Sequence, residues 1–166
     1  FAISRTTITN AQYVLFVNDS NHPVPSHWTN RRAPPGRRNH PVVNVTLYDA
    51  IAYCEWLTHL FKQPFSLPSE AEWEKAARGM HALIYPWGNK WETSRANTVE
   101  MGLRDTLPVS ELTVGQSSFG LLHMAGNVFE WTRTIWGLDE EKPDYVYPYD
   151  ENDGREALGT GPEVYR

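Results

Sequence analysis

Three segments in the first half of the chain have apolar residues at helical spacing behind a capping signal. Residues 9–12 and 69–72 each have the S/T-x-x-E/Q form of a capping box. Thr46 can cap a further segment, in which positions 47, 50, 51, 54, 57 and 61 form an apolar stripe of helical period. The pattern therefore predicts helices over residues 10–19, 47–61 and 70–78, the last one ending at Gly79.

The periodicity is lost after Gly79. Gly, Pro, Asn, Asp and Ser recur every few positions, and large aromatic residues are spread among them. So many aromatic residues favour an ordered, loop-rich structure over a disordered tail. Short strands are expected at residues 84–85, 108–109 and 128–131. Together these features predict an α+β fold with more than half of the residues outside helix and strand, above the ~40% of typical globular proteins.

Length and charge restrict the class of protein. A chain of 166 residues is enough for one core, so we expect a single domain over residues 1–166. Both ends of the sequence resemble positions inside a domain, so we expect the domain to be incomplete, with a C-terminal segment missing.

The net charge of -5 argues against a nucleic-acid partner, and no apolar run reaches the ~20 residues of a membrane span. The arginines at positions 31, 32, 37 and 38 are interpreted as a solvated loop, with an anionic-ligand site as the alternative.

Cys54 is the only cysteine, so no intrachain disulfide can form. With no leader visible, this favours a cytoplasmic protein of prokaryotic type. A thiol on an apolar helix stripe should have a raised pKa and be inert, which indicates a structural role for Cys54. The six histidines form no cluster at metal-ligand spacing.

Six blocks of sequence, in order, resemble one known family. They are residues 7–13 (TITNAQY), 40–56 (HPVVNVTLYDAIAYCEW), 67–79 (LPSEAEWEKAARG), 85–89 (YPWGN), 95–97 (RAN) and 119–131 (FGLLHMAGNVFEW). The chain resembles the formylglycine-generating enzyme or sulfatase-modifying factor superfamily. The resemblance implies a C-type-lectin-like core with little regular structure.

The resemblance leaves the function open, because members of this superfamily divide into separate classes. Some use copper to oxidise a sulfatase cysteine to formylglycine, and others, joined to an iron-binding helical bundle, oxidise histidine betaine derivatives. Others are ligand-binding modules, including the variable proteins of diversity-generating retroelements. Copper chemistry needs a pair of soft thiolate ligands, whereas this chain has only Cys54, which matches the structural helix cysteine of the family. Residues 61–68 and 147–156 resemble the non-catalytic members.

These observations favour a non-catalytic recognition or sensor module, with no catalytic or cofactor-binding residues of its own. It would present its C-terminal loops to a protein or small-molecule ligand, within a larger multidomain polypeptide. The alternative is a copper-dependent formylglycine-generating oxidase whose cysteine pair lies beyond Arg166.

The resemblance also implies structural Ca²⁺, for which two loop segments offer oxygen ligands. The first set is the Asn127 amide, the Val128 carbonyl and the Glu130 carboxylate. The second set is Asn97, a carbonyl near Thr98, and Asp105. In the alternative without metal, Asn127 caps a tight turn and Glu130 pairs with Arg133 or Arg78.

Overall fold

The three predicted helices are confirmed, and all three begin at a capping box. A computed structural model describes residues 1–139, 141–157 and 164–165. Helices α1, α2 and α3 span Asn10–Asp19, Leu47–Phe61 and Glu70–Arg78. At the start of each helix, the side-chain hydroxyl of the N-cap residue accepts a hydrogen bond from the backbone N–H of the residue three positions later. The side chain of that later residue accepts a hydrogen bond from the backbone N–H of the N-cap residue. Two of the four N–H groups that lack a helical partner are thereby satisfied. As predicted, α3 ends at Gly79, whose φ of 70° suits glycine.

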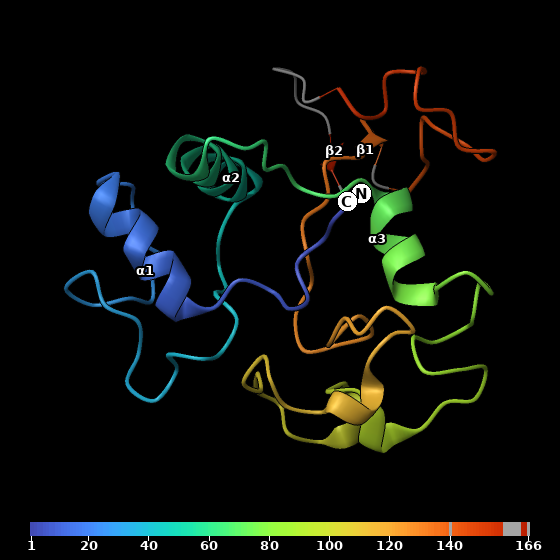
Figure 1. The fold of residues 1–166 in the computed structure, drawn as a ribbon, viewed down its shortest axis with the longest axis horizontal. Coiled ribbons are helices and arrows are strands. Elements are labelled where there is room, and N and C mark those ends of the chain that lie inside the picture. The colour runs from blue at the N-terminus through green and yellow to red at the C-terminus, as the bar shows by residue number, and fades with distance from the viewer. Residues whose placement is uncertain (140, 158–163, 166) are drawn as a thin grey trace.

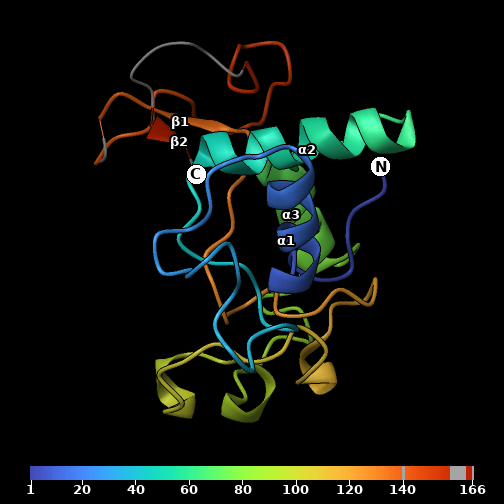
Figure 2. The same ribbon diagram turned by 90° about the vertical axis from the view of Figure 1, so that its left-hand side faces the viewer.

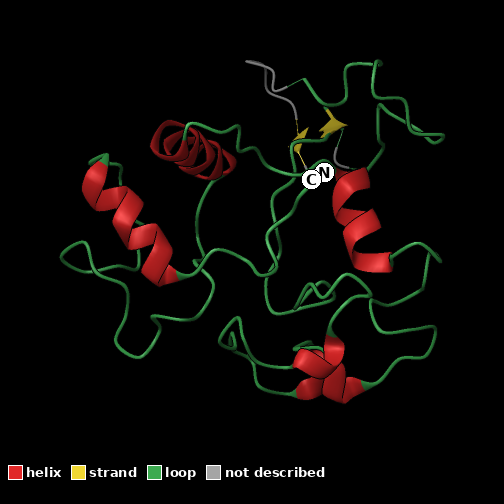
Figure 3. Ribbon diagram, in the orientation of Figure 1, coloured by secondary structure: helices red, strands yellow, loops and turns green. Residues whose placement is uncertain are grey.

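The remainder of the described chain contains little regular structure, as expected (Figure 3). Three 3₁₀ turns span Thr93–Arg95 (η1), Val99–Met101 (η2) and Thr113–Gly115 (η3). Strand β1 (Ile135–Gly137) pairs antiparallel with β2 (Val164–Tyr165), in the register Ile135↔Tyr165 and Gly137↔Val164. The sequence pattern did not predict either strand.

The three predicted strands are wrong, because these segments bond to isolated partners and pair with no neighbouring strand among the described residues. Residues 84–85 form only a single bridge, from Tyr85 to Gly88. In the second segment the Val109 N–H donates to the Asn39 carbonyl, at 2.9 Å. In the third, the Trp131 indole donates to the Val45 carbonyl, at 3.0 Å. Bonds of this kind connect distant loops without forming a ladder.

The helices lie in two groups. Figure 1 shows α1 and α2 on one side of the molecule and α3 on the other, with the 3₁₀ turns grouped below α3. Figure 2 shows that α2 lies across α1 at a steep angle. Strand β1 and the chain after it lie at one end of the molecule, next to the N-terminal end of α3 (Figures 1 and 2).

Each helical group has its own core. Between α1 and α2, Tyr13, Phe16, Val17, Trp28 and Tyr53 are buried together, and their aromatic rings are 5.2–6.0 Å apart in four edge-on or stacked pairs. Around α3, a smaller core contains Ala76, Ala77, Leu121 and Met124, with Trp73 packed against it. The stripe prediction for α2 is partly wrong, because Phe61 at its C-terminal end is 58% exposed.

The arginine-rich loop is more structural than the solvated-loop interpretation predicted. Arg31 donates to the carbonyls of Val17 and His22, which ties the end of α1 to the loop. Arg37 forms an ion pair with Asp105 in the loop-rich half. Arg32 and Arg38 are exposed. Within the described residues, no helix has the length and apolarity to span a bilayer.

Candidate functional site

Three of the residues proposed as calcium ligands meet in one hydrogen-bonded cluster. The Asn127 side-chain oxygen accepts from the Leu107 N–H at 2.7 Å and from the Asn97 amide at 3.0 Å. The Asn97 amide also donates to the Asp105 carbonyl at 2.7 Å. Asn127 has a φ of 78°, in the left-handed region that asparagine tolerates better than most residues. The Asn127 side chain therefore does not cap a turn of its own; its amide joins three loops.

Gly126 allows the close contact on which this cluster depends. A Cβ atom at this position would lie 2.7 Å from the Asn97 carbonyl oxygen and 3.1 Å from the Thr98 methyl group. Any larger residue at position 126 would push the backbone of residues 97–98 away from Asn127. The N–H of Asn127 would then lose its 2.8 Å bond to the Asn97 carbonyl. Glycine is therefore required at position 126 for steric reasons.

Asp105 and Thr98 also lie at this cluster, but the groups that face it are not the oxygen atoms proposed as calcium ligands. The Asp105 carboxylate bonds to Arg37 and to the Thr106 N–H, and these contacts hold its pKa below the ordinary value. Only the main-chain carbonyl of Asp105 faces Asn97. The Thr98 methyl group lies where a Cβ atom at position 126 would come within 3.1 Å of it.

Glu130 lies apart from the amide cluster and has no cationic partner among the described residues. Its carboxylate accepts one hydrogen bond, from the Trp73 indole at 3.2 Å. Burial raises the pKa of Glu130 to about 7, and this single hydrogen bond only partly opposes the rise. The expected alternative pairing is wrong, because Arg133 pairs with Glu72 and Glu156, and Arg78 pairs with Glu74.

The residues present fit a calcium ion at Glu130 better than at Asn127. The Asn127 oxygen already accepts two hydrogen bonds and has no lone pair left for a metal. A desolvated carboxylate with one donor and no counter-charge, in contrast, is suited to a bound cation. In the described part of the chain, no three His, Cys, Asp or Glu residues are grouped to hold a metal on side chains alone. Main-chain carbonyls, such as that of Val128, would have to complete the site.

Cys54 lies on α2 as a free thiol and is half-buried. Burial, with a smaller effect from neighbouring Glu55, raises its pKa to about 11. Almost none of the thiol is therefore ionised at neutral pH, and the thiolate is the form that attacks electrophiles or binds metal. This position agrees with the predicted structural role.

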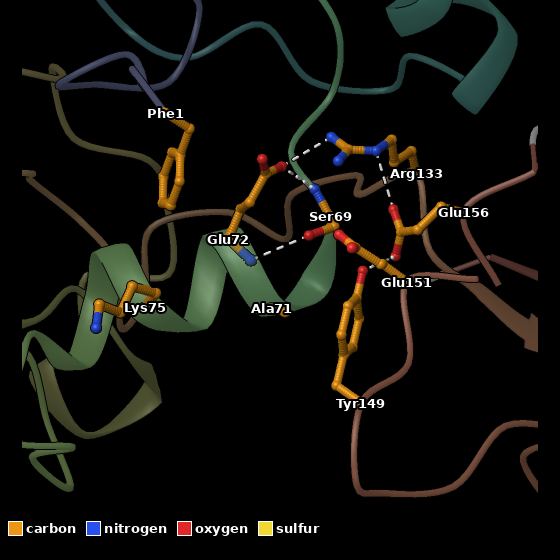
Figure 4. A pocket seen from close by; sticks show the side chains of 9 residues that line it. All are labelled: Phe1, Ser69, Ala71, Glu72, Lys75, Arg133, Tyr149, Glu151 and Glu156. Atoms are coloured by element: carbon orange, nitrogen blue, oxygen red, sulfur yellow. Dashed lines mark hydrogen bonds and ion pairs between the residues drawn. The ribbon is translucent and has the colours of Figure 1, made fainter. Parts of the chain in front are cut away.

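A groove at the start of α3 was not found from the sequence. Its volume is about 480 Å³, and its lining comprises Phe1, Ser69, Ala71, Glu72, Lys75, Arg133, Tyr149, Glu151 and Glu156. Figure 4 shows Arg133 between two carboxylates, and its distances are 2.8 Å to Glu72 and 2.9 Å to Glu156. The Tyr149 hydroxyl donates to Glu156 at 2.6 Å. The only hint in the sequence was the D-G-R-E motif at residues 153–156, which contains one of these carboxylates.

The charges in this groove are mostly neutralised within it. Burial would raise the pKa of Glu72, but bonds from the Ser69 amide and from Arg133 outweigh it and hold that pKa below its ordinary value. Arg133 is engaged by two carboxylates and by the Leu67 carbonyl, so its charge is already balanced and it is a poor anion receptor. Among the described residues, Glu151 and Lys75 are the lining charges without an ion pair. The groove can thus bind polar groups, and it shows no nucleophile paired with a base.

A second, smaller hollow lies along another face of α3. Its volume is about 320 Å³, and Trp73, Ile84, Tyr85 and Met124 are among its lining residues. Tyr85 continues into an aromatic group with Trp87 and Trp91, whose ring centroids lie 5.2–5.7 Å apart. The Trp73 indole faces Glu130, so this hollow borders the proposed calcium position.

Comparison with known proteins identifies the family of this arrangement. The family described as sulfatase-modifying factor enzyme 1-like domain matches residues 1–159. The formylglycine-generating enzyme of Mus musculus is 32% identical over 159 residues, covering 83% of this chain and 41% of the enzyme. The inactive C-alpha-formylglycine-generating enzyme 2 of the same species is 35% identical and covers 69% of this chain and 40% of that protein.

Two further similarities concern a different protein context and the fold. A serine/threonine-protein kinase, pkn1, of Chlamydia pneumoniae is 39% identical over 133 residues, covering 80% of this chain but only 19% of the kinase. The structure of PvdO from Pseudomonas aeruginosa superposes with a TM-score of 0.65 at 24% identity, covering 80% of this chain and 56% of PvdO. The chain thus spans about two fifths of the formylglycine-generating enzymes it matches. It belongs to the family of sulfatase-modifying factor enzyme 1-like domains.

Proposed function

We propose that this chain is a non-catalytic recognition or sensor module on a formylglycine-generating-enzyme scaffold of C-type-lectin-like type. The observation that carries the proposal is the position of the only thiol. Cys54 is half-buried on α2 and has a pKa of about 11. One inert thiol cannot provide the two soft ligands that copper-dependent cysteine oxidation requires.

The relatives support this role from two directions. One similar protein is itself described as inactive, so the scaffold occurs without formylglycine-generating activity. In the chlamydial kinase, the matching region is a small part of a longer polypeptide, which supports a domain that works beside others. The subtype that we favour is that of the variable proteins of diversity-generating retroelements, which display C-terminal loops on a rigid core.

The properties of the chain suggest the kind of ligand and the location. A net charge of -5 favours a protein or small-molecule ligand over a nucleic acid. A lone free thiol is compatible with a reducing compartment, and we propose the cytoplasm. The groove at the start of α3 and the chain after β1 form the surface that we assign to binding, because they contain an open hollow beside exposed side chains.

Structural calcium is part of the same proposal. Glu130 and main-chain carbonyls, including that of Val128, would hold one Ca²⁺ beside Trp73, where the carboxylate has no other cation. Asn127 would hold the neighbouring loop in place through its three hydrogen bonds, without touching the ion. The second location, near Asn97 and Asp105, has its side chains committed to other partners, so we propose the first location.

The alternative function is formylglycine generation by a cysteine pair beyond Arg166, and the 32% identity to the mouse enzyme favours it. The test incubates the purified full-length protein with Cu(I), oxygen and a cysteine-containing sulfatase peptide, and mass spectrometry detects conversion of the thiol to an aldehyde. We expect no conversion, with or without the substitution Cys54→Ser. Aldehyde formation by both proteins would establish the oxidase and end the non-catalytic proposal.

A further inference from the structure

The acidic residues of this chain are concentrated in the segment after β1. Residues 138–157, defined here as the acidic loop, contain eight of the twenty acidic residues and two of the fifteen basic ones. Its formal charge is therefore -6, while the whole chain has -5. The remainder of the protein is close to neutral, so the field that a partner meets comes mainly from this loop.

A buried arginine ties together several parts of this loop between residues 145 and 155. Arg155 is only 3% exposed, and its guanidinium pairs with Asp153 at 2.6 Å and donates to the Val146 carbonyl at 3.0 Å. It also lies over the rings of Tyr149 and Tyr145, at 4.8 and 5.5 Å from their centroids. Each contact joins a different part of the loop to one side chain. Because these contacts tie residues 145–155 together, binding through this part of the loop would cost less ordering entropy than binding through an untied segment.

The loop is also attached to β1 at its base. The Ile135 N–H donates to the Arg155 carbonyl at 2.7 Å, and the Asp144 N–H donates to the Trp136 carbonyl at 2.9 Å. Gly137 makes this approach possible, because a Cβ atom there would lie 2.7 Å from the Asp144 carboxylate. The acidic loop is therefore tied to β1 by backbone hydrogen bonds at its base.

Large apolar side chains project from this fixed backbone. Leu138, Val146 and Tyr147 are 65%, 69% and 57% exposed. Figures 1 and 2 both show the loop at one end of the molecule, beyond α2 and α3, with no other described element over it. Water-exposed apolar groups on an ordered loop are typical of surfaces that another molecule covers.

The surroundings of these apolar groups indicate the charge of that molecule. Glu141 and Glu151 are exposed and have no ion pair with any described residue. Glu151 also lines the groove at the start of α3, where Tyr149 provides an aromatic wall. A lysine or arginine side chain that approaches from the acidic loop would meet the unpaired Glu151 carboxylate, which favours a cation, whereas Lys75 lines the same groove.

We propose that the acidic loop, with the adjoining groove, is the docking surface for a partner protein that presents lysine or arginine side chains beside apolar ones. This inference rests on the recognition role proposed above and specifies its partner. The apolar tip provides contact area, and the carboxylates select a basic surface and speed its approach.

The test measures binding of two synthetic peptides to the purified full-length protein by fluorescence anisotropy. One repeats Lys-Leu-Gly and the other repeats Lys-Ser-Gly, so they match in charge and differ in apolar content. We expect the leucine peptide to bind more tightly, and both to weaken when NaCl is raised from about 0.05 M to about 0.5 M. The double substitution Val146→Ser with Tyr147→Ser should weaken binding of the leucine peptide and leave binding of the serine peptide unchanged.

A charge-matched pair of variants separates a docking site from general attraction. The double substitution Glu141→Lys with Glu151→Lys should lower the affinity for the leucine peptide by roughly tenfold or more. Glu55→Lys with Glu111→Lys produces the same net charge change at exposed positions outside the loop and should have little effect. Equal effects of the two pairs, or no binding of either peptide, would overturn the proposal. So would a homodimer, seen by sedimentation, that the loop variants dissociate. The assay for conversion of the sulfatase peptide, given above, tests the non-catalytic role independently of this docking surface.

Discussion

The two halves of this molecule are held together in different ways. In residues 1–79, the helices α1 and α2 bury a cluster of aromatic rings between them. In residues 80–157, the chain shares a small core with α3 and relies on polar side chains that bond to backbone groups elsewhere in the loops, such as Asn127 and Arg155. Irregular chain must satisfy its N–H and C=O groups individually, so a few polar side chains replace the ladders of a sheet.

The largest effect is expected from the aromatic core of the helical half. Phe16 is 2% exposed and contacts Tyr13, Tyr53 and Trp56. Phe16→Ala should lower the free energy of unfolding by about 3–5 kcal/mol, because it removes a large ring and leaves a cavity. The neighbouring Leu15 is 60% exposed, and Leu15→Ala should cost about 0.5 kcal/mol or less. Urea denaturation measures the free energy of unfolding of both variants. Similar losses in the two would mean that burial of the aromatic core does not stabilise this half.

In the loop-rich half, one polar side chain should matter nearly as much. Asn127→Ala removes the acceptor for the Leu107 N–H and for Asn97, and it places alanine at a φ of 78°. The expected loss is about 2–4 kcal/mol, from unsatisfied buried groups and backbone strain together. Asn21 has a φ of 55° but is exposed, so Asn21→Ala reports the strain alone. If both variants lose the same stability, the hydrogen bonds of Asn127 contribute nothing.

Calcium would sharpen the contrast between the halves. A site at Glu130 exists only in the folded state, so Ca²⁺ at a hundred times its dissociation constant should add about 2.7 kcal/mol. Chelation should then lower the melting temperature, and Glu130→Gln should remove the calcium dependence. Glu111→Gln, at an exposed carboxylate, should leave that dependence intact. A melting temperature that does not respond to chelator would exclude a structural calcium ion here.

How much the sequence predicts also differs between the halves. The bounds of all three helices followed from capping boxes and apolar spacing, because these signals are local. The loops gave no such signal, since the partners of Leu107, Arg133 and Arg155 lie up to 66 residues away or depend on the geometry of turns. Glu130 could be singled out by its type and position, but its partner Trp73 could not, because α3 had first to be placed beside it. The groove at the start of α3 was missed for the same reason.

The smallest effect is expected from a polar contact in the helical half. His22 bonds to Asp49 at 2.7 Å, beside the cap of α2. Burial opposes ionisation of Asp49, but the Thr46 amide and His22 outweigh it and hold the Asp49 pKa below 3.8. Because the folded-state pKa is the lower one, the contribution of this carboxylate is present above pH 3.8 and is lost as the pH falls below it.

Both side chains of this pair are partly exposed, so its contribution should be at most about 1 kcal/mol. Asp49→Asn keeps an oxygen that can accept the Thr46 N–H but cannot ionise. The difference in unfolding free energy between the natural protein and this variant should therefore shrink as the pH is lowered from about 6 to about 2.5. A difference that stays constant would show that the charge of Asp49 contributes nothing. A difference as large as that of Phe16→Ala would contradict the view that packing dominates the helical half.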